Sequence, residues 1–319
     1  MPNEATFRAW DQKLPNVSQG TAIPKIIHQI YAQFSAVSES RIPNCGSGPS
    51  TSPRAPPSLP EPLEKNVTRI KSLNPTWEHR LYDQAEITDF VHSNYGPDVL
   101  AQYERIDPRY GAARADLFRY LLIYRVGGVY LDIKSTFFKP LDQVLLPDDV
   151  YVLSRWKGAQ FKTWGNHRIL QPFGGKEFQQ WHVIAAAGHP FLRAVIIRVL
   201  SHLDTYNPLF HATGRMGVNW STGPIAYTLA IAPLLSQHRH RLVGGQDELG
   251  LEYTIFGEPD RAHKSVFRHH YTELDQPVVH LKGARRLAWA VLGPIQIHVV
   301  YRLQRLHGAI ARRISRLWP

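Results

Sequence analysis

A short apolar segment, Gly128 to Leu131, is followed at once by the acidic residue Asp132 and two positions later by Lys134. Such a segment is typical of a buried strand. Open α/β sheets bind ligands at the carboxyl ends of their strands, where the loops diverge. A carboxylate there can ligate Mg²⁺ or Mn²⁺, which in turn bridges the oxygens of a diphosphate. Two acids, Asp-x-Asp, are the usual arrangement, and here Lys134 occupies the second position.

A second pair of chemically capable residues, Asp116 and Arg119, precedes this strand. Residues three apart lie on the same face of a helix, so this pair can form a local ion pair. Both stand close to Gly127-Gly128 and therefore near the end of the next strand. A carboxylate accepts and a guanidinium donates hydrogen bonds in fixed geometry, so either group could also bind sugar hydroxyls.

The surrounding sequence predicts strands and helices in alternation, which is the pattern of an α/β domain with a mostly parallel sheet. Strands are expected at 24–31, 77–82, 128–132 and 151–154. Helices are expected at 63–73, 84–93, 107–126, 190–203 and 222–235. The third helix is expected to begin at Asp107-Pro108, because Asp is a good N-cap and Pro fits the first helical position. Gly127-Gly128 should end it.

Composition and charge narrow the class of protein. The net charge of +11 indicates attraction to an anionic partner such as nucleotide phosphates, nucleic acid or acidic lipid. A single cysteine, Cys45, excludes an internal disulfide framework and a cysteine-based zinc site. The sixteen histidines lack the spacing of a zinc motif. The first twenty residues lack the pattern of a secretory signal, and no apolar run is long and clean enough for a spanning helix.

The C-terminal residues 281–319 contain no acid and carry much of the positive charge. From Gln296 onward a helical projection separates apolar residues from arginines. The apolar set is Val300, Leu303, Leu306, Ile310, Ile314, Leu317 and Trp318, and the basic set is Arg302, Arg305, Arg312, Arg313 and Arg316. This pattern is typical of a helix lying in an anionic membrane surface. The alternative is that the apolar side docks on the main domain. Nucleic acid is not expected, because no recognised binding module is present.

Several segments in order resemble the donor site of the family 32 glycosyltransferases, which include the yeast outer-chain mannosyltransferases, and the related glucosyltransferase domains of clostridial toxins. The central match is Ala115-Asp116-Leu-Phe-Arg119 followed by Gly127-Gly128-Val-Tyr-Leu-Asp132. Further matching segments are residues 24–31, 74–82, 187–190 and 222–224. The resemblance covers roughly residues 22 to 290 with gaps.

This resemblance implies a GT-A nucleotide-sugar transferase fold, a nucleotide-sugar donor, a divalent cation (Mn²⁺ or Mg²⁺) and transfer with retention at the anomeric carbon. Asp116 and Arg119 would hold the donor sugar, and Asp132 would hold the diphosphate through the metal. Three residues of the first strand, His28, Gln29 and Tyr31, would lie near the nucleoside end.

The resemblance also implies a histidine near the C-terminus at the site. His280, with Trp289 further along, is the nearest match and is assigned as a second metal ligand, while His269-His270 is the rival. At Lys134 two outcomes are open. Either a metal still binds through Asp132 and later groups, or the lysine neutralises the phosphate in its place.

The sequence therefore predicts an N-terminal extension at 1–21, a GT-A domain at 22–290 with a Pro/Ser-rich loop at 41–62, and a basic amphipathic helix at 291–319. The expected activity is metal-assisted transfer of a hexose from a UDP- or GDP-sugar to a glycan or glycolipid acceptor, as in polysaccharide biosynthesis. The expected place is the cytoplasmic face of a membrane. The competing hypothesis is a nucleotide-sugar-binding module that has lost catalysis.

Overall fold

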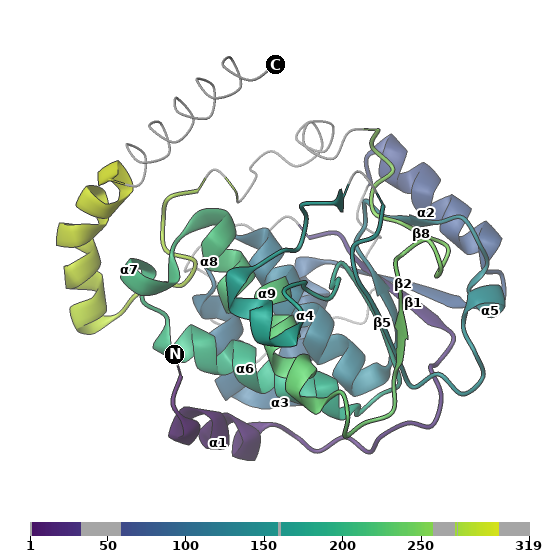
Figure 1. Ribbon diagram of the computed structural model, residues 1–319, viewed down its shortest axis with the longest axis horizontal. Helices are drawn as coiled ribbons and strands as arrows, with labels where there is room; N and C mark the ends of the chain where they lie inside the picture. The colour runs from purple at the N-terminus through teal and green to yellow at the C-terminus, as the bar shows by residue number, and fades with distance from the viewer. Residues whose placement is uncertain (1, 33–58, 159–160, 258–271, 273, 300–319) are drawn as a thin grey trace, which may run out of the picture.

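The computed structural model describes residues 2–32, 59–158, 161–257, 272 and 274–299 of the chain. A sheet lies between helices on either side (Figure 1). It has six strands in the order β2-β1-β3-β6-β5-β7. Its strands are β1 (Ile26–Ile30), β2 (Glu78–Tyr82), β3 (Gly128–Leu131), β5 (Tyr151–Ser154), β6 (His182–Ala185) and β7 (Arg241–Val243). A second sheet pairs β4 (Thr136–Phe137) with β8 (Leu251–Glu252).

Five of the six central strands run in the same direction. The parallel pairs are β1 with β2, β1 with β3, and β5 with β7, whereas β6 is antiparallel to both of its neighbours, β3 and β5. The start of β6 therefore lies at the same edge of the sheet as the ends of the other strands. The prediction of an α/β fold with a mostly parallel central sheet is confirmed.

The side chains of β3 alternate between two hydrophobic clusters, as the period of two in a strand requires. Tyr130 packs against the helices of one face, while Val129 and Leu131 belong to the cluster of the other face. The first face is covered by α3 (Gln84–Arg105), α4 (Gly111–Val126), α6 (Pro190–Thr205), α8 (Gly214–Ser221) and α9 (Pro224–Ile231). The second is covered by α2 (Glu61–Leu73), α5 (Leu141–Val144) and the small sheet.

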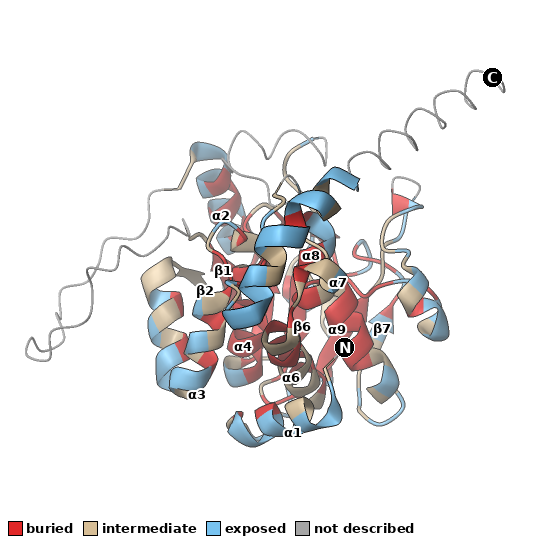
Figure 2. Cartoon of the chain, turned by 90° about the vertical axis from the view of Figure 1, so that its left-hand side faces the viewer, coloured by how far each residue is buried: buried red, intermediate tan, exposed pale blue. Residues whose placement is uncertain are grey.

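Helix α4 lies deep in the molecule, which explains why it is apolar on nearly all sides. Eleven of its residues are buried, including both Asp116 and Arg119, and Figure 2 shows this helix in the buried interior. It ends at Gly127, whose φ is 75°, and β3 starts at Gly128, whose φ is 107°. A β-carbon on Gly128 would lie 2.6 Å from the carbonyl oxygen of Ile26 on the neighbouring strand. The Gly-Gly pair therefore permits both the turn and the close approach of β1 and β3.

The predicted beginning of this helix was wrong. Helix α4 starts at Gly111 rather than at Asp107-Pro108. The carboxylate of Asp107 accepts hydrogen bonds from the backbone N–H of Arg109 and from its guanidinium, at 2.9 and 2.6 Å. These contacts hold a turn at 107–110, and the helix begins only after it.

Other elements differ in extent from the sequence prediction. Helix α3 continues from Gln84 to Arg105 across a kink at Gly96-Pro97, whereas the sequence prediction ended this helix at residue 93. Helices α1 (Glu4–Lys13) and α7 (Pro208–His211) and strands β6 and β7 were not predicted. A C-terminal helix already begins at residue 283 and continues to 299, with Gly293-Pro294 inside it. The predicted apolar set from Val300 onward lies outside the described residues.

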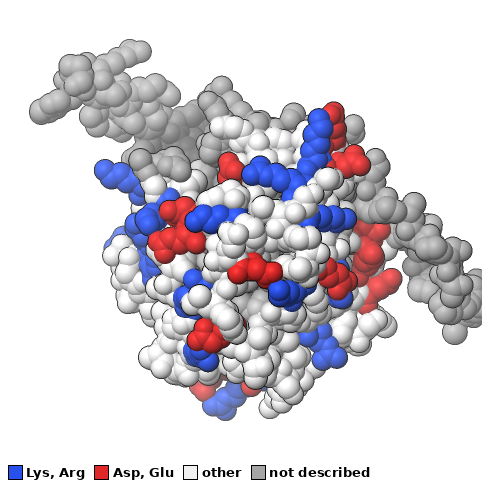
Figure 3. Space-filling view, turned by 90° about the vertical axis from the view of Figure 1, so that its right-hand side faces the viewer, with Lys and Arg blue, Asp and Glu red and all other residues white. Residues whose placement is uncertain are grey.

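Charged side chains of both signs are interspersed on the surface shown in Figure 3 rather than gathered into one basic patch. The region 281–299 differs, because it carries Lys282, Arg285 and Arg286 without an acid. Within the described part of the chain, no helix combines the length and apolar character needed to cross a bilayer.

Candidate functional site

A cavity of about 200 Å³ opens at the edge of the sheet where β3 and β5 end and β6 begins. It contains charged and polar side chains from several elements together with four large aromatic rings. The charged and polar residues are Asp116, Arg119, Asp132, Lys134, His167, Glu177, Gln180, Arg215 and Asn219. The aromatic residues are Trp156, Trp164, Trp181 and Tyr253. All four residues predicted to be catalytic thus line one cavity.

Asp132 follows β3 directly, and its carboxylate is held in place on one side only. Oδ1 accepts a hydrogen bond from the hydroxyl of Tyr130 at 2.9 Å and forms an ion pair with Nη2 of Arg119 at 3.2 Å. No described residue donates to Oδ2. The side chain is 23% exposed, whereas Asp116 and Arg119 are each 4% exposed. Asp132 is therefore the carboxylate of this cluster that can still reach a ligand.

Arg119 joins the two acids. Its Nη2 lies 3.1 Å from Oδ1 of Asp116 and 3.2 Å from Oδ1 of Asp132. Its Nη1 donates to the backbone and side-chain oxygens of Gln180 at 2.7 and 2.8 Å, and its Nε donates to the Ala115 carbonyl at 3.2 Å. Each guanidinium nitrogen already has a partner. Arg119 thus positions Asp132, while its predicted contact with the donor sugar stays a prediction.

Both carboxylate oxygens of Asp116 also have partners. It accepts from the hydroxyl of Thr222 at 2.9 Å and from the amide of Gln180 at 3.2 Å, besides the ion pair with Arg119. Burial raises the pKa of Asp116, and the neighbouring Arg119 acts in the opposite direction. Burial also raises the pKa of Tyr130, so that its hydroxyl remains a hydrogen-bond donor to Asp132.

Lys134 points its ammonium group into the same cavity. Its Nζ donates to the hydroxyl of Tyr253 at 2.9 Å and lies 4.2 Å from the centre of that ring. Such an arrangement combines a hydrogen bond with a cation–π contact. No described carboxylate pairs with Lys134, so its charge is available to an anionic ligand.

Among the residues that the structure describes, Asp132 is the one protein ligand that a divalent cation would find at this point of the cavity. Within the described residues, no group of three or more His, Cys, Asp or Glu side chains could hold a metal ion. Mg²⁺ is commonly bound by one or two carboxylates together with substrate phosphates and water. The free oxygen of Asp132 fits that mode, provided that a diphosphate supplies further ligands.

The three residues predicted for the nucleoside end do not line the cavity. His28 is fully buried, and its ring contacts the Tyr82 hydroxyl and the Gly127 carbonyl oxygen, each at 3.0 Å. Burial lowers the pKa of His28 to about 4, so this histidine is neutral and structural. The amide of Gln29 reaches the backbone oxygen of Asp132 at 3.4 Å and so helps to fix that residue. Tyr31 packs against a small hydrophobic cluster with Ile133.

His280 is also not brought to the cavity. It is exposed, and its backbone N–H donates to the carbonyl of Arg105 at 2.8 Å, next to the bridge between Ile106 and Val279. Trp289 belongs to the helix at 283–299 and lies against Gly293. His269 and His270 lie outside the described residues. The assignment of His280 as a metal ligand alongside Asp132 therefore has no support in the described structure.

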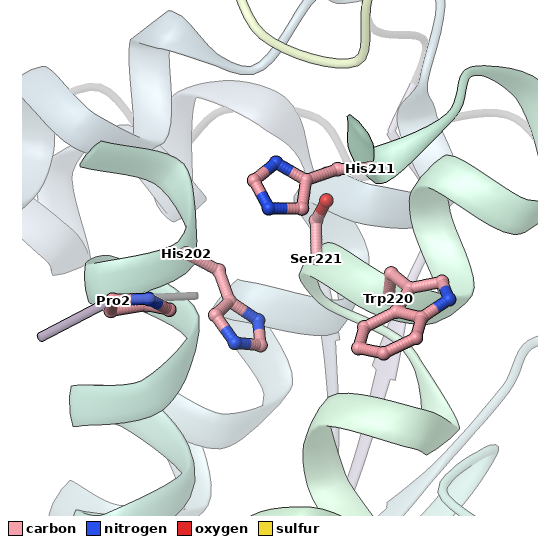
Figure 4. A pocket seen from close by; sticks show the side chains of 5 residues that line it. All are labelled: Pro2, His202, His211, Trp220 and Ser221. Atoms are coloured by element: carbon pink, nitrogen blue, oxygen red, sulfur yellow. The ribbon is translucent and has the colours of Figure 1, made fainter. Parts of the chain in front are cut away.

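A second, much smaller cavity lies beside α6 and α8 (Figure 4). Its volume is about 20 Å³, and it is lined by Pro2, His202, His211, Trp220 and Ser221. A space of this size holds a water molecule rather than a sugar. Nδ1 of His202 has no hydrogen-bond partner among the described residues, so it is a suitable partner for such a water.

Several residues of the main cavity were missed by the sequence prediction. Gln180 bridges Asp116 and Arg119, and Thr222 holds Asp116, although Thr222 already lay in a matching segment. The pair His167 and Glu177 is joined at 2.6 Å. These residues lie in loops or far along the chain, and no local periodicity marks them.

The fold and the cavity thus define an α/β protein with a carboxylate and a lysine at the tip of a central strand. Residues 60–151 match the family described as "Glycosyltransferase sugar-binding region containing DXD motif". This segment includes Asp116, Arg119, Asp132 and Lys134, and Lys134 stands where the second acid of that motif would be. This part of the chain is therefore similar to a glycosyltransferase sugar-binding region, and the predicted resemblance to glycosyltransferases is confirmed.

Curated relatives agree with this class. The chain is 26% identical to an initiation-specific alpha-1,6-mannosyltransferase of Candida albicans over 54% of its own length. It is 28% identical to inositol phosphoceramide mannosyltransferase 3 of Schizosaccharomyces pombe over 65% of its own length. The matches cover 47% and 44% of those proteins. A solved structure titled PaToxG Glycosyltransferase aligns over 92% of this chain and 91% of its own, with 15% identity and a TM-score of 0.44, a likeness too distant to define the fold.

Proposed function

We propose that this protein is a retaining glycosyltransferase that moves a hexose from a UDP- or GDP-sugar to a glycan or glycolipid acceptor. The observation that carries the proposal is the half-paired carboxylate of Asp132, held by Tyr130 and Arg119 in a cavity that it shares with Lys134. A diphosphate needs positive charge around it, and Lys134 supplies one such charge. The mannosyltransferase relatives favour a hexose donor.

In the proposed reaction, the acceptor hydroxyl attacks the anomeric carbon from the side of the leaving group. The new bond joins the acceptor oxygen to that carbon, while the bond from the carbon to the β-phosphate oxygen breaks. The hydroxyl proton passes to the departing phosphate. A bound divalent cation would stabilise negative charge on the diphosphate. Lys134 stabilises the same charge, and the Arg119 network keeps Asp132 in its orientation.

The test is hydrolysis of a panel of UDP- and GDP-sugars with Mn²⁺ or Mg²⁺, by the wild type and by Asp132→Asn. The proposal expects turnover of at least one donor, with a loss of about 10²-fold or more in the variant. Equal turnover in the variant would contradict it. The competing function is a binding module without catalysis, which the lysine in the second acidic position favours. Nucleotide binding by calorimetry without turnover of any donor would support that alternative.

A second part of the proposal concerns the place of action, an anionic membrane surface. The helix at 283–299 exposes an apolar row along one side: Leu287 is 71% exposed, Val291 67% and Ile295 59%. In Figure 2 this helix lies on the outside of the molecule. Two hydrogen bonds join it to the domain, from Arg285 to the Asp204 carbonyl at 2.7 Å and from Gln296 to the Leu209 carbonyl at 3.3 Å.

The basic residues around this row favour binding to a membrane with anionic lipids. Lys282, Arg285 and Arg286 flank it, and five further arginines follow in the sequence beyond residue 299 without any acid. Each basic residue near an anionic surface contributes about 1 kcal/mol of binding. Because the cytoplasmic leaflet carries the anionic lipids, we propose that the protein works peripherally at the cytoplasmic face of a membrane.

Co-sedimentation with vesicles tests this part. The wild type should bind vesicles that contain phosphatidylserine and bind pure phosphatidylcholine much less. The triple variant Leu287→Ser, Val291→Ser, Ile295→Ser should lose most of this binding, because its apolar row is gone. The exposed His298→Ser on the same helix serves as the control. Binding of the triple variant at the level of the control would refute membrane contact through this row.

A further inference from the structure

One wall of the main cavity is aromatic. The ring of Trp156 contacts those of Trp164 and Tyr253, with centroids 5.2 Å apart in each case, and Tyr253 contacts Trp181 at 5.4 Å. All four rings line the cavity. Together they form a wall that starts at Tyr253, where Lys134 is bound, and continues into the loop after β5. The polar side chains around Asp132 thus lie beside an aromatic surface that can bind the apolar face of a ligand.

Hydrogen bonds hold the described residues of the loop after β5, which carries Trp156 and Trp164. Glu177 accepts a hydrogen bond from Nε1 of Trp156 at 2.8 Å, and its backbone N–H donates to Gly165 at 2.8 Å. The backbone N–H of His167 donates to the carbonyl of Gly175 at 2.9 Å. At Gly165 φ is +70°, and a β-carbon there would lie 2.6 Å from the ring of Trp156. The loop is therefore built to bring Trp156, Trp164 and His167 to one side of the cavity.

His167 presents a hydrogen-bond acceptor beside these rings. Its Nε2 lies 2.6 Å from Oε2 of Glu177, whose other oxygen is occupied by Trp156. In the neutral imidazole, the carboxylate requires the proton to sit on Nε2, which leaves Nδ1 as the acceptor. No described residue donates to Nδ1. A ligand group that donates a hydrogen bond, such as a sugar hydroxyl, meets this requirement.

The order of strands places this wall on one side of β3. In the sheet β1 lies on one side of β3, whereas β6 and β5 lie on the other. Trp156 follows β5 and Trp181 precedes β6, so both belong to the side away from β1. If the diphosphate of the donor lies at Asp132 and Lys134, the aromatic wall remains for the second substrate.

We propose that Trp156, Trp164 and His167 form the subsite for the acceptor saccharide, with Glu177 as the residue that positions His167. The C–H face of a pyranose ring lies on the indole of Trp164, because those hydrogens are weakly positive and the face of the ring is negative. Nδ1 of His167 accepts a hydrogen bond from a hydroxyl of this saccharide. This inference rests on the proposed glycosyltransferase function and names the acceptor class as a saccharide ring.

Saturation-transfer NMR with methyl α-D-mannopyranoside and methyl α-D-glucopyranoside tests the subsite without any need for catalysis. The wild type should show saturation transfer to at least one of these glycosides. Trp164→Leu should reduce it about fivefold or more, because the aromatic face is lost. Trp220→Leu, at the small cavity of Figure 4, is the matched control and should keep the signal.

A subtler variant tests the role of Glu177. In Glu177→Gln the carboxamide oxygen still accepts from Trp156, so its NH₂ group must face Nε2 of His167. The proton of the imidazole then moves to Nδ1, and the acceptor becomes a donor. Glycoside binding should fall in this variant with no loss of thermal stability beyond that of the control. The ratio of transfer to hydrolysis, measured with a donor that turns over, should fall in parallel.

The outcomes separate this inference from the proposed function. If no nucleotide sugar is hydrolysed but glycosides bind through Trp164, the proposed catalysis fails and the subsite stands. If the wild type binds neither glycoside, or Trp164→Leu binds as well as the wild type, the subsite is refuted. Saturation transfer to the bases of UMP or GMP that depends on Trp164, without any to the glycosides, would refute it in favour of the nucleobase.

Discussion

Nη2 of Arg119 lies 3.2 Å from Oδ1 of Asp132, so that a residue in the middle of α4 holds the carboxylate at the tip of β3. The same nitrogen lies 3.1 Å from Asp116, and the other guanidinium nitrogens bind Gln180 and Ala115. One buried arginine therefore determines the position of both acids. Arg119 thereby couples the two acids to each other.

Arg119→Lys should remove activity although it keeps the charge. A lysine offers one point of contact, whereas the guanidinium serves four oxygen-bearing partners with a planar fork. The buried carboxylate of Asp116 would lose its guanidinium partner and keep only the hydrogen bonds from Thr222 and Gln180, which costs several kcal/mol of stability. We expect donor hydrolysis to fall about 10²-fold or more and the melting temperature to fall by several degrees.

The matched control for this substitution is Arg125→Lys on the same helix. Arg125 is exposed and contacts Asn94 at 3.1 Å, so its replacement should change neither quantity appreciably. Donor hydrolysis and thermal melting measured in parallel for the two variants decide the matter. If Arg119→Lys behaves like Arg125→Lys, the guanidinium fork is not what orients Asp132.

We expect Lys134 to determine how strongly donor hydrolysis depends on a metal ion. Lys134→Asp restores the second acid of the motif and removes a cation that repels Mn²⁺, so the concentration of Mn²⁺ for half-maximal hydrolysis should fall. Lys134→Ala should lower the rate about 10²-fold if the ammonium group stabilises the departing phosphate. A titration of hydrolysis with Mn²⁺, started from metal-free protein, measures both effects.

Lys139→Ala is a suitable control for these variants, because Lys139 is exposed and does not line the cavity. Its metal titration should match that of the wild type. An unchanged Mn²⁺ requirement in Lys134→Asp, together with an unchanged rate in Lys134→Ala, would show that Lys134 serves neither the metal nor the phosphate.

Gly128→Ala should destabilise the whole domain. Gly128 has a φ of 107°, which residues with a β-carbon rarely adopt, and an added methyl group would meet the backbone of β1 at 2.6 Å. The two strands would have to move apart, so we expect a clear fall in the urea midpoint. At Gly257 an added methyl group meets nothing within 4 Å, so Gly257→Ala is the control. Equal midpoints for both variants would contradict the close packing of β1 and β3.

Sequence patterns predicted the site best where its residues lie close together in the sequence. The ion pair of Asp116 and Arg119 follows from helical spacing, and the place of Asp132 follows from an apolar strand that ends in an acid. The Gly-Gly break was readable for the same reason, since the two glycines end one element and begin the next.

Long-range partners could not be read in this way. Gln180 and Thr222 bind Asp116 from positions 64 and 106 residues away, and only tertiary packing brings them there. His28 illustrates the opposite error. A histidine in a matching segment was expected at the ligand, yet its ring fills the space beside Gly127 in the interior. Position along a strand was predictable, whereas the face on which a side chain packs was not.

Because several histidines are buried, the free energy of unfolding should fall as the pH falls. Burial lowers the pKa of His28 and His202 to about 4 and that of His182 to about 3, against an ordinary value of 6.5. The unfolded chain therefore takes up protons below about pH 6.5 that the folded protein does not. The stability from these neutral histidines is fully present above that pH and declines as the pH falls toward 4. Each of them contributes a slope of about 1.4 kcal/mol per pH unit within this window.

His202→Gln tests this linkage at a residue that lines the small cavity beside α6 and α8. Nδ1 of His202 has no described partner, so the substitution should cost little at pH 7.5 while removing one titrating group. Urea unfolding at several pH values between 4.5 and 7.5 should give a slope lower by about 1.4 kcal/mol per pH unit than in the wild type. The exposed His92→Gln should leave the slope unchanged. Parallel pH profiles for His202→Gln and the wild type would mean that His202 is protonated in the folded protein, against the effect of its burial.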